Sequence, residues 1–272
     1  MRARSLYVLR TLLTVLAPLL AGAGPAWADR TDFADGYLVQ RVPRGEMLVV
    51  LVAGLAGEDT WRRFVTLMEA DPALQRSDVL VYHSPAAFDI DQQAERLETV
   101  LREHGRHHAR QAYIGHSIGG LIVKRMLLRR MAAQWRDAER PALVLTLGTP
   151  LDTDKFSISV FRRLGASVFW PLVPPLRREV FNIQRLEDIS QAWRTALGSG
   201  ALAGMRVVSV FGTDDEIAPA REERASESTV FIRGDHLSIA TPKDAADCPY
   251  LILKTLLVEP QARLQSLSCI PR

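Results

Sequence analysis

Short apolar runs rich in valine and leucine recur along the chain, and most are followed by a segment with helical spacing. The run MLVVLVA at 47–53 is continuously apolar, which is typical of a strand buried on both faces of a parallel sheet. The next segment, 58–70, begins with acidic residues and then places apolar side chains three or four positions apart, as an amphipathic helix does. The same pattern predicts further strands at 78–82, 110–115, 142–147, 205–211 and 228–232, and further helices at 89–104, 118–131 and 249–258.

This alternation predicts an α/β fold, with a mostly parallel central sheet and helices on both faces. In such sheets ligands bind at the carboxyl ends of the strands, so the loops there are the places to look for functional residues. The segment 149–200 departs from the alternation and has three prolines between positions 171 and 175. We interpret it as a cap or lid inserted over the strand ends, with Phe169 and Trp170 as candidate lid or substrate contacts. The alternative is an extra amphipathic helix packed on the core.

The first 28 residues have the three parts of a secretory signal peptide. Three arginines and no acid come first, an apolar run follows, and Ala26 and Ala28 supply small residues at the −3 and −1 positions of a cleavage site. Cleavage after Ala28 would leave a single domain, 29–272, exported to the periplasm or secreted. An uncleaved membrane anchor is the alternative, although the apolar run is shorter than the roughly 20 residues that a spanning helix needs.

Charge and cysteine spacing argue against nucleic-acid binding and against a metal or redox site. Cleavage would remove three arginines and leave 31 basic against 31 acidic side chains, so a nucleic-acid partner is not expected. The two cysteines, Cys248 and Cys269, could pair in an oxidising compartment or stay as separate thiols, because spacing alone does not determine their geometry. No CxxC spacing occurs, and we expect neither a metal nor a cofactor.

The segment YIGHSIGG at 113–120 contains a Gly-x-Ser-x-Gly motif between a predicted strand and a predicted helix. A nucleophile elbow requires this context, and Gly115 and Gly119 would leave room for its sharp turn. Ser117 is therefore the candidate nucleophile. A simple glycine turn is the alternative, but it does not account for the position of the motif at the end of a central strand.

A base and an acid are expected after the serine, in the chain order serine, acid, histidine. Of the six histidines only His236 follows Ser117, and it comes just after the predicted strand at 228–232. Asp214 and Asp215 follow the predicted strand at 205–211, and either carboxylate could orient the imidazole. Asp235 is adjacent to the histidine and therefore poorly aimed for that hydrogen bond.

An oxyanion hole needs two backbone amides directed at the reacting carbonyl oxygen. The residue after the nucleophile, Ile118, would supply one of them. The second is expected in the loop AGLAG at 53–57, after the first predicted central strand, and Leu55 is the candidate.

In this order the motifs resemble those of the α/β-hydrolase superfamily, in particular the lipase-like serine esterases of the DUF676 and SERAC1-like group, which is related to PGAP1-type deacylases. LVAGLAGEDTW resembles the oxyanion loop of the group, with Ala53 where the family often has histidine. YIGHSIGGLIVKRML resembles its elbow, TLGTPLDTDKF its Gly-Thr-Pro strand end, GTDDEIAP its acid loop and GDHLSIATP its histidine segment. The register of the acid loop, with the aspartate four residues before proline, selects Asp215 over Asp214.

The resemblance spans 47–258 and implies a serine hydrolase that acts on carboxylic esters, with lipid or other acyl esters as substrates. An acyltransferase with the same residues, or a degenerate hydrolase fold that serves as a binding module, are the alternatives. The apolar, arginine-bearing segment at 156–180 further suggests peripheral contact with a membrane.

Overall fold

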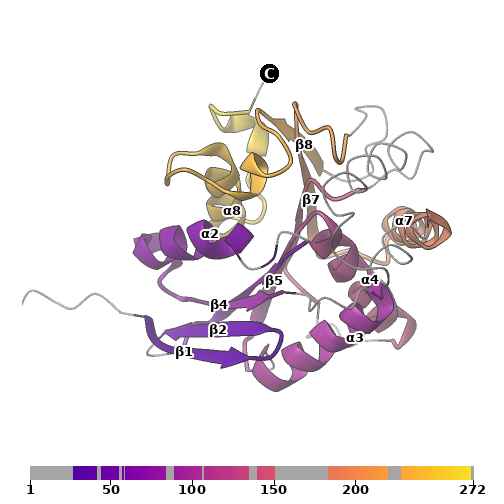
Figure 1. The fold of residues 1–272 in the computed structure, drawn as a ribbon, viewed down its shortest axis with the longest axis horizontal. Helices are drawn as coiled ribbons and strands as arrows, with labels where there is room; N and C mark the ends of the chain where they lie inside the picture. The colour runs from indigo at the N-terminus through magenta and orange to yellow at the C-terminus, as the bar shows by residue number, and fades with distance from the viewer. Residues whose placement is uncertain are drawn as a thin grey trace, which may run out of the picture.

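The structure, a computed structural model, describes residues 27–41, 44–54, 57, 59–83, 89–105, 107–134, 140–150, 183–219 and 228–270. Within these residues the chain forms an eight-stranded sheet in the order β1-β2-β4-β3-β5-β6-β7-β8 (Figure 1). The strands are β1 (Trp27–Phe33), β2 (Gly36–Arg41), β3 (Met47–Val52), β4 (Ser77–Tyr82), β5 (Arg110–His116), β6 (Leu143–Leu147), β7 (Arg206–Gly212) and β8 (Ser228–Ile232). The α-helices are α2 (Asp59–Ala70), α3 (Ile90–Val100), α4 (Ile118–Ala132), α7 (Ile183–Gly198) and α8 (Cys248–Val258).

All six predicted strands are present, as β3 to β8, and they pair in parallel. The expectation of a mostly parallel sheet is therefore confirmed. Sequence analysis did not predict β1 and β2, which form an antiparallel hairpin at one edge, where β2 also pairs antiparallel with β4. These strands carry polar residues and lack the continuous apolar runs that identify the buried strands.

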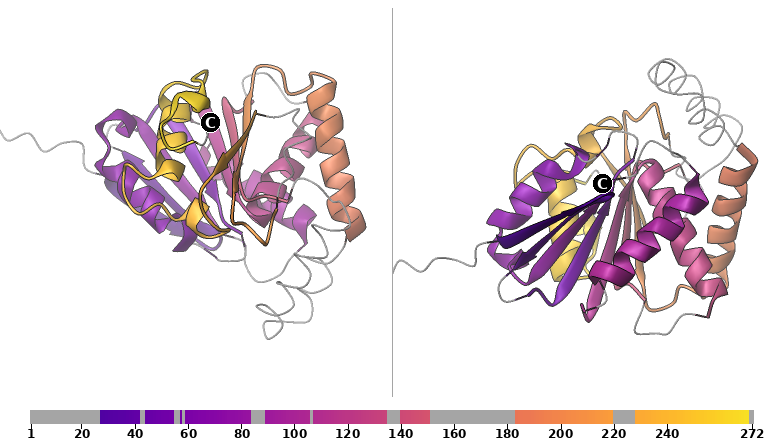
Figure 2. Two further views of the ribbon diagram at one scale, coloured as in Figure 1. Left: turned by 90° about the horizontal axis from the view of Figure 1, so that it is seen from above. Right: turned by 60° about the horizontal axis from the view of Figure 1, so that its bottom comes forward.

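Helices cover both faces of the sheet, as Figure 2 shows from two further directions. α2 and α8 lie on one face, while α3, α4 and α7 lie on the other (Figure 1). Each face has its own hydrophobic core, and successive residues of β3 alternate between them: Val49 and Leu51 belong to one core, Leu48 and Val50 to the other. The continuous apolar run of the sequence thus reflects burial on both sides.

Of the segment 149–200, interpreted as a cap, the structure describes residues 149–150 and 183–200. There α7 is an amphipathic helix whose buried side chains Leu186, Ile189 and Trp193 join the core beneath α4. α7 thus packs on the core, and the interpretation of the segment as a cap stays a prediction. Phe169 and Trp170 lie outside the described residues.

Cys248, the first residue of α8, forms a disulfide with Cys269, with 5.6 Å between their Cα atoms. Of the two alternatives left open by the sequence, pairing is the one that the structure shows. The bond ties the C-terminal segment to α8, and two side chains of that segment, Leu264 and Ile270, are buried in the adjacent core. Among the helices of the described ranges, none has the length and apolar character needed to cross a membrane.

Candidate active site

Ser117 occupies a sharp turn between β5 and α4. Its backbone has φ 53° and ψ −127°, a strained conformation for a residue with a side chain. Two hydrogen bonds hold the turn against the neighbouring chain: the Ser117 amide donates to the Leu147 carbonyl at 2.9 Å, and Thr149 Oγ1 donates to the Ser117 carbonyl at 3.0 Å. The turn is therefore supported by β6 and by the residues that follow β6.

The glycines of the elbow are required by close backbone contacts. A Cβ atom at Gly115 would lie 2.5 Å from the Cα atom of Gly120. A Cβ atom at Gly119 would lie 2.2 Å from the carbonyl oxygen of Val52. Because real Cβ atoms do not approach other atoms so closely, no larger residue fits at either position without a shift of the backbone.

The structure brings Ser117, His236 and Asp215 together at the carboxyl ends of β5, β8 and β7. His236 Nε2 lies 3.0 Å from Ser117 Oγ, and His236 Nδ1 lies 2.9 Å from Asp215 Oδ2. The other oxygen of Asp215 accepts hydrogen bonds from the amides of Ile217 and Ala218, at 2.9 and 2.8 Å. The carboxylate is fully buried and both of its oxygens accept hydrogen bonds, so one oxygen faces the imidazole in a defined direction.

The two neighbouring aspartates have different surroundings. Asp214 is exposed, and its side chain accepts a hydrogen bond from Thr213 Oγ1 at 3.3 Å. Asp215 is buried and faces the histidine. Asp235 is next to His236 in sequence, but its carboxylate is directed elsewhere. Its Oδ1 atom accepts hydrogen bonds from the backbone amides of Leu237 and Ser238, the two residues after the histidine. Asp235 shapes the turn that carries His236.

Of the two candidate oxyanion amides, the structure describes one. Ile118 is the first residue of α4, so its amide lies at the positive end of the helix dipole, directly after the serine. Leu55 lies outside the described residues. Its neighbour Gly54 lies against the elbow, because a Cβ atom there would be 3.0 Å from Ser117 Cβ and 3.6 Å from the Ile118 amide nitrogen. The loop after β3 therefore starts beside the nucleophile.

Gly148 is a site residue that sequence reasoning did not assign. It follows β6, the strand between β5 and β7, and has φ 53°. A Cβ atom there would lie 3.0 Å from Asp215 Oδ2 and 3.1 Å from His236 Nδ1. A larger residue would press on the hydrogen bond between acid and base. In the sequence, Gly148 lies in the motif TLGTP, which contributed to the family resemblance but did not indicate a role for this glycine.

His116, immediately before the nucleophile, was also missed. Its Nε2 atom lies 2.8 Å from the carbonyl oxygen of His236, and the two imidazole rings are 4.8 Å apart. Burial lowers the pKa of His116 to about 4, with a smaller contribution from the charge of His236. In the sequence it is a variable position of the elbow motif, and no spacing relates it to a residue 120 positions away.

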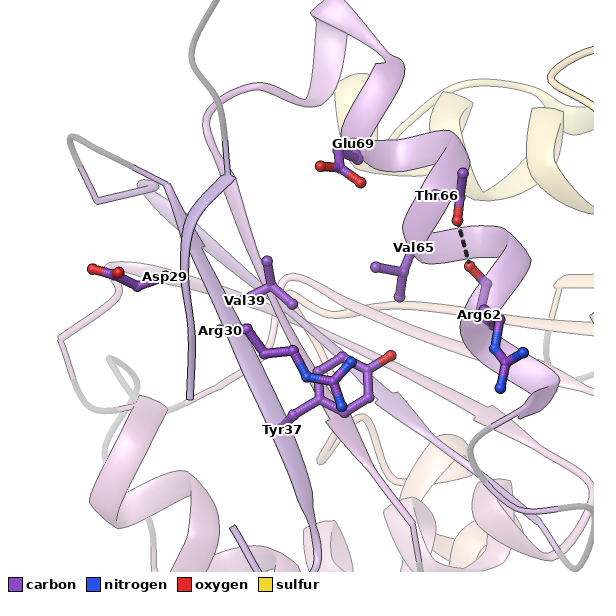
Figure 3. A pocket seen from close by; sticks show the side chains of 8 residues that line it. All are labelled: Asp29, Arg30, Tyr37, Val39, Arg62, Val65, Thr66 and Glu69. Atoms are coloured by element: carbon purple, nitrogen blue, oxygen red, sulfur yellow. Dashed lines mark hydrogen bonds between the residues drawn. The ribbon is translucent and has the colours of Figure 1, made fainter. Parts of the chain in front are cut away.

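A separate groove of about 330 Å³ lies between α2 and the β1–β2 hairpin (Figure 3). No residue of the Ser117, His236 and Asp215 constellation lines it. The guanidinium group of Arg30 lies over the Tyr37 ring, 3.8 Å from its centroid, and also pairs with Asp32 at 2.8 Å. Arg62 likewise pairs with Asp59. Both arginines are therefore paired with aspartates close to them in sequence, and the groove is separate from Ser117.

The sequence matches no protein-family model and no curated protein sequence. In structure the chain is similar to carboxyl esterase 2 from the mycorrhizal fungus Tuber melanosporum, with a TM-score of 0.60 and 14% identity over 89% of this chain and 87% of that one. It is also similar to Est1E from Butyrivibrio proteoclasticus, with a TM-score of 0.56 and 15% identity over 88% and 100% of the two chains. A bacterial membrane phospholipase A, described as a virulence factor, gives a TM-score of 0.53 and 16% identity over 94% of each chain. With the sheet order and the helices on both faces, these likenesses show that the chain has the α/β-hydrolase fold.

Proposed function

We propose that this chain is a serine hydrolase that cleaves carboxylic esters through an acyl-enzyme intermediate. The observation that carries the proposal is the continuous hydrogen-bonded array from Asp215 through His236 to Ser117, with distances of 2.9 and 3.0 Å. A buried carboxylate at Nδ1 favours the tautomer in which that nitrogen carries the proton. The lone pair of Nε2 then faces the serine hydroxyl, as general-base catalysis requires.

The reaction follows from these roles. His236 Nε2 takes the Ser117 proton as Oγ bonds to the acyl carbon, and the Asp215 carboxylate stabilises the imidazolium that forms. The amide of Ile118, together with that of Leu55 as the proposed second donor, stabilises the negative charge on the carbonyl oxygen. The imidazolium then protonates the leaving alcohol, and an acyl-enzyme remains. Water, deprotonated by the same histidine, releases the acid and regenerates Ser117.

The proposed substrates are lipid or other acyl esters. Support comes from two structurally similar proteins, a carboxyl esterase and a phospholipase A, and from the sequence motifs. The narrower assignment to the DUF676 and SERAC1-like group rests on those motifs alone.

We further propose that the chain is exported and that 156–180, including Phe169 and Trp170, contacts a lipid surface. The disulfide between Cys248 and Cys269 suits an oxidising compartment. The contact with lipid is suggested by the sequence FRRLGASVFWPLVPPLRR, in which a pair of arginines flanks each end of a mainly apolar run. If charged replacements of Phe169 and Trp170 changed the hydrolysis of aggregated and soluble esters equally, the proposal of a lipid contact would be rejected.

A fluorophosphonate probe tests the nucleophile directly, because it forms a covalent bond with an activated serine. Wild type should be labelled and should hydrolyse members of a panel of p-nitrophenyl esters and phospholipids, whereas Ser117→Ala should do neither. Folded wild type that resists the probe would overturn the proposal. Product analysis with an added alcohol separates hydrolysis from acyl transfer.

The acid is tested by a matched pair of substitutions at adjacent positions. Asp215→Asn should lower kcat by about 10⁴-fold, the cost found when the acid of a serine triad is replaced by its amide. Asp214→Asn makes the same chemical change on an exposed side chain and should leave kcat within about twofold, since surface substitutions have small effects. Equal losses in both variants would contradict the assignment of Asp215.

A further inference from the structure

Two consecutive residues of the elbow contact the same residue on the opposite loop. Ser117 meets the ring of His236 through its hydroxyl, at 3.0 Å. His116 meets the main chain of His236 through its Nε2 atom, at 2.8 Å from the carbonyl oxygen. The base is therefore contacted at its ring by Ser117 and at its backbone by the preceding residue, the last of β5.

The protonation state of His116 follows from these contacts. A carbonyl oxygen can only accept a hydrogen bond, so Nε2 must carry the proton and donate it. Nδ1 is then the bare nitrogen, and it is buried without a hydrogen-bond partner in the described part of the chain. Only 1% of the residue is exposed. A proton on Nδ1 would be a buried charge without a hydrogen-bond acceptor, so burial favours the neutral ring, which a single hydrogen bond orients.

Neutrality matters because of what lies beside the ring. The imidazoles of His116 and His236 are 4.8 Å apart, at an angle of 44°. A charged His116 would repel the imidazolium that forms on His236 during the reaction. The low pKa of the buried His116, about 4, keeps the ring uncharged while its neighbour gains and loses protons.

Other contacts shape the loop around the base without acting on His236 itself. The Asp214 amide donates to the Gly234 carbonyl at 3.0 Å, and Asp235 Oδ1 accepts from the amides of Leu237 and Ser238. The bond from His116 acts on the histidine's own carbonyl. It therefore couples the position of the base to the position of the nucleophile, which is the next residue after His116 at the end of β5.

We propose that His116 is a positioning residue: its Nε2–H group holds the main chain of His236 so that the imidazole stays within reach of Ser117. This rests on the hydrolytic function proposed above. Loss of the donor should let the base move away from the serine while substrate binding stays largely intact. Since a displacement of about 1 Å can cost about 100-fold in rate, kcat should fall and KM should change little.

Two substitutions separate the donor from the shape of the side chain. His116→Phe fills the space of the ring but cannot donate, and we expect kcat to fall by about 10- to 100-fold with KM within about twofold. The Nε2 atom of glutamine can occupy nearly the place of the imidazole Nε2, so His116→Gln should recover most of kcat. His116→Leu is a smaller variant without a donor, for use if the phenylalanine variant does not fold.

Stability must be distinguished from positioning, so each rate is divided by the number of sites titrated with the fluorophosphonate probe. Thr146→Val is a matched control, because it removes a buried hydrogen bond from β6 to Ser209 Oγ, 3.0 Å long, without touching the base. It should lower the unfolding temperature and leave kcat per titrated site unchanged.

Two outcomes would overturn the inference. One is a wild-type kcat per titrated site in His116→Phe, or in His116→Leu. The other is a glutamine variant as slow as the phenylalanine variant. Wild type that neither labels nor hydrolyses esters would instead reject the proposed function, and this inference with it, so the two failures are distinguishable.

Discussion

Acidification between about pH 6.5 and about pH 4 should destabilise this protein through His116. In the folded protein the ring donates from Nε2 to a carbonyl, and its Nδ1 is buried without a partner in the described structure. A second proton would place an uncompensated charge in the core. Burial therefore lowers the pKa of His116 from 6.5 to about 4.

The sign of the effect follows from proton uptake. Below pH 6.5 the unfolded chain binds a proton at this histidine, while the folded chain does not until the pH approaches 4. Falling pH therefore favours the unfolded state throughout this window. At about 1.4 kcal/mol per pKa unit, the free energy of unfolding should fall by about 3 kcal/mol by the time the lower value is reached. Domains are typically stable by about 5–15 kcal/mol, so this loss is large.

The measurement is urea unfolding of wild type and His116→Gln, followed by tryptophan fluorescence at intervals from about pH 7 to about pH 4. Glutamine does not titrate, and the other ionisable groups are common to both proteins, so they cancel in the difference. Wild type should lose stability faster, with a difference in slope that approaches about 1.4 kcal/mol per pH unit. Parallel curves for the two proteins would refute the reasoning, because they would mean that His116 takes up its proton equally in both states.

Three further predictions concern other parts of the molecule. Gly148→Ala should lower the free energy of unfolding by roughly 1–2 kcal/mol, because alanine is strained in the left-handed backbone conformation. It should also lower kcat, because the added Cβ atom presses on the hydrogen bond between Asp215 and His236, and an unchanged kcat would contradict this. Asp78→Asn disrupts a fully buried hydrogen bond between the Asp78 carboxylate and His108 Nε2, 2.8 Å long, and should lower the free energy of unfolding by about 1–3 kcal/mol in denaturant titrations. Cys248→Ser removes the disulfide between residues 21 positions apart and should lower the free energy of unfolding by about 3 kcal/mol. A reduced wild type with the same free energy of unfolding as the oxidised protein would argue against that value.

Much of the fold could be predicted because strands buried on both faces have apolar sequences that can be recognised locally. The short apolar runs of β3 to β8 and the helical patterns between most of them identified a parallel sheet and the edge at which residues of the site meet. The β1–β2 hairpin has no such apolar run, since β1 is an edge strand with a polar sequence that is ordered by pairing with β2. α7 was likewise not separated from the segment 149–200, because its packing on α4 is a contact between distant parts of the chain.

The same distinction holds at the site. The sequence by itself identified Ser117 and His236 as candidates, because each follows a recognisable strand and the chain order leaves one histidine. Between Asp214 and Asp215 the residues alone left a choice, and the tertiary structure decided the contact: the turn after β7 exposes the first carboxylate and directs the second at the imidazole. The environments of His116 and Gly148 were also decided by tertiary structure, because they depend on backbone atoms that only the packing of β5, β6 and β8 brings together.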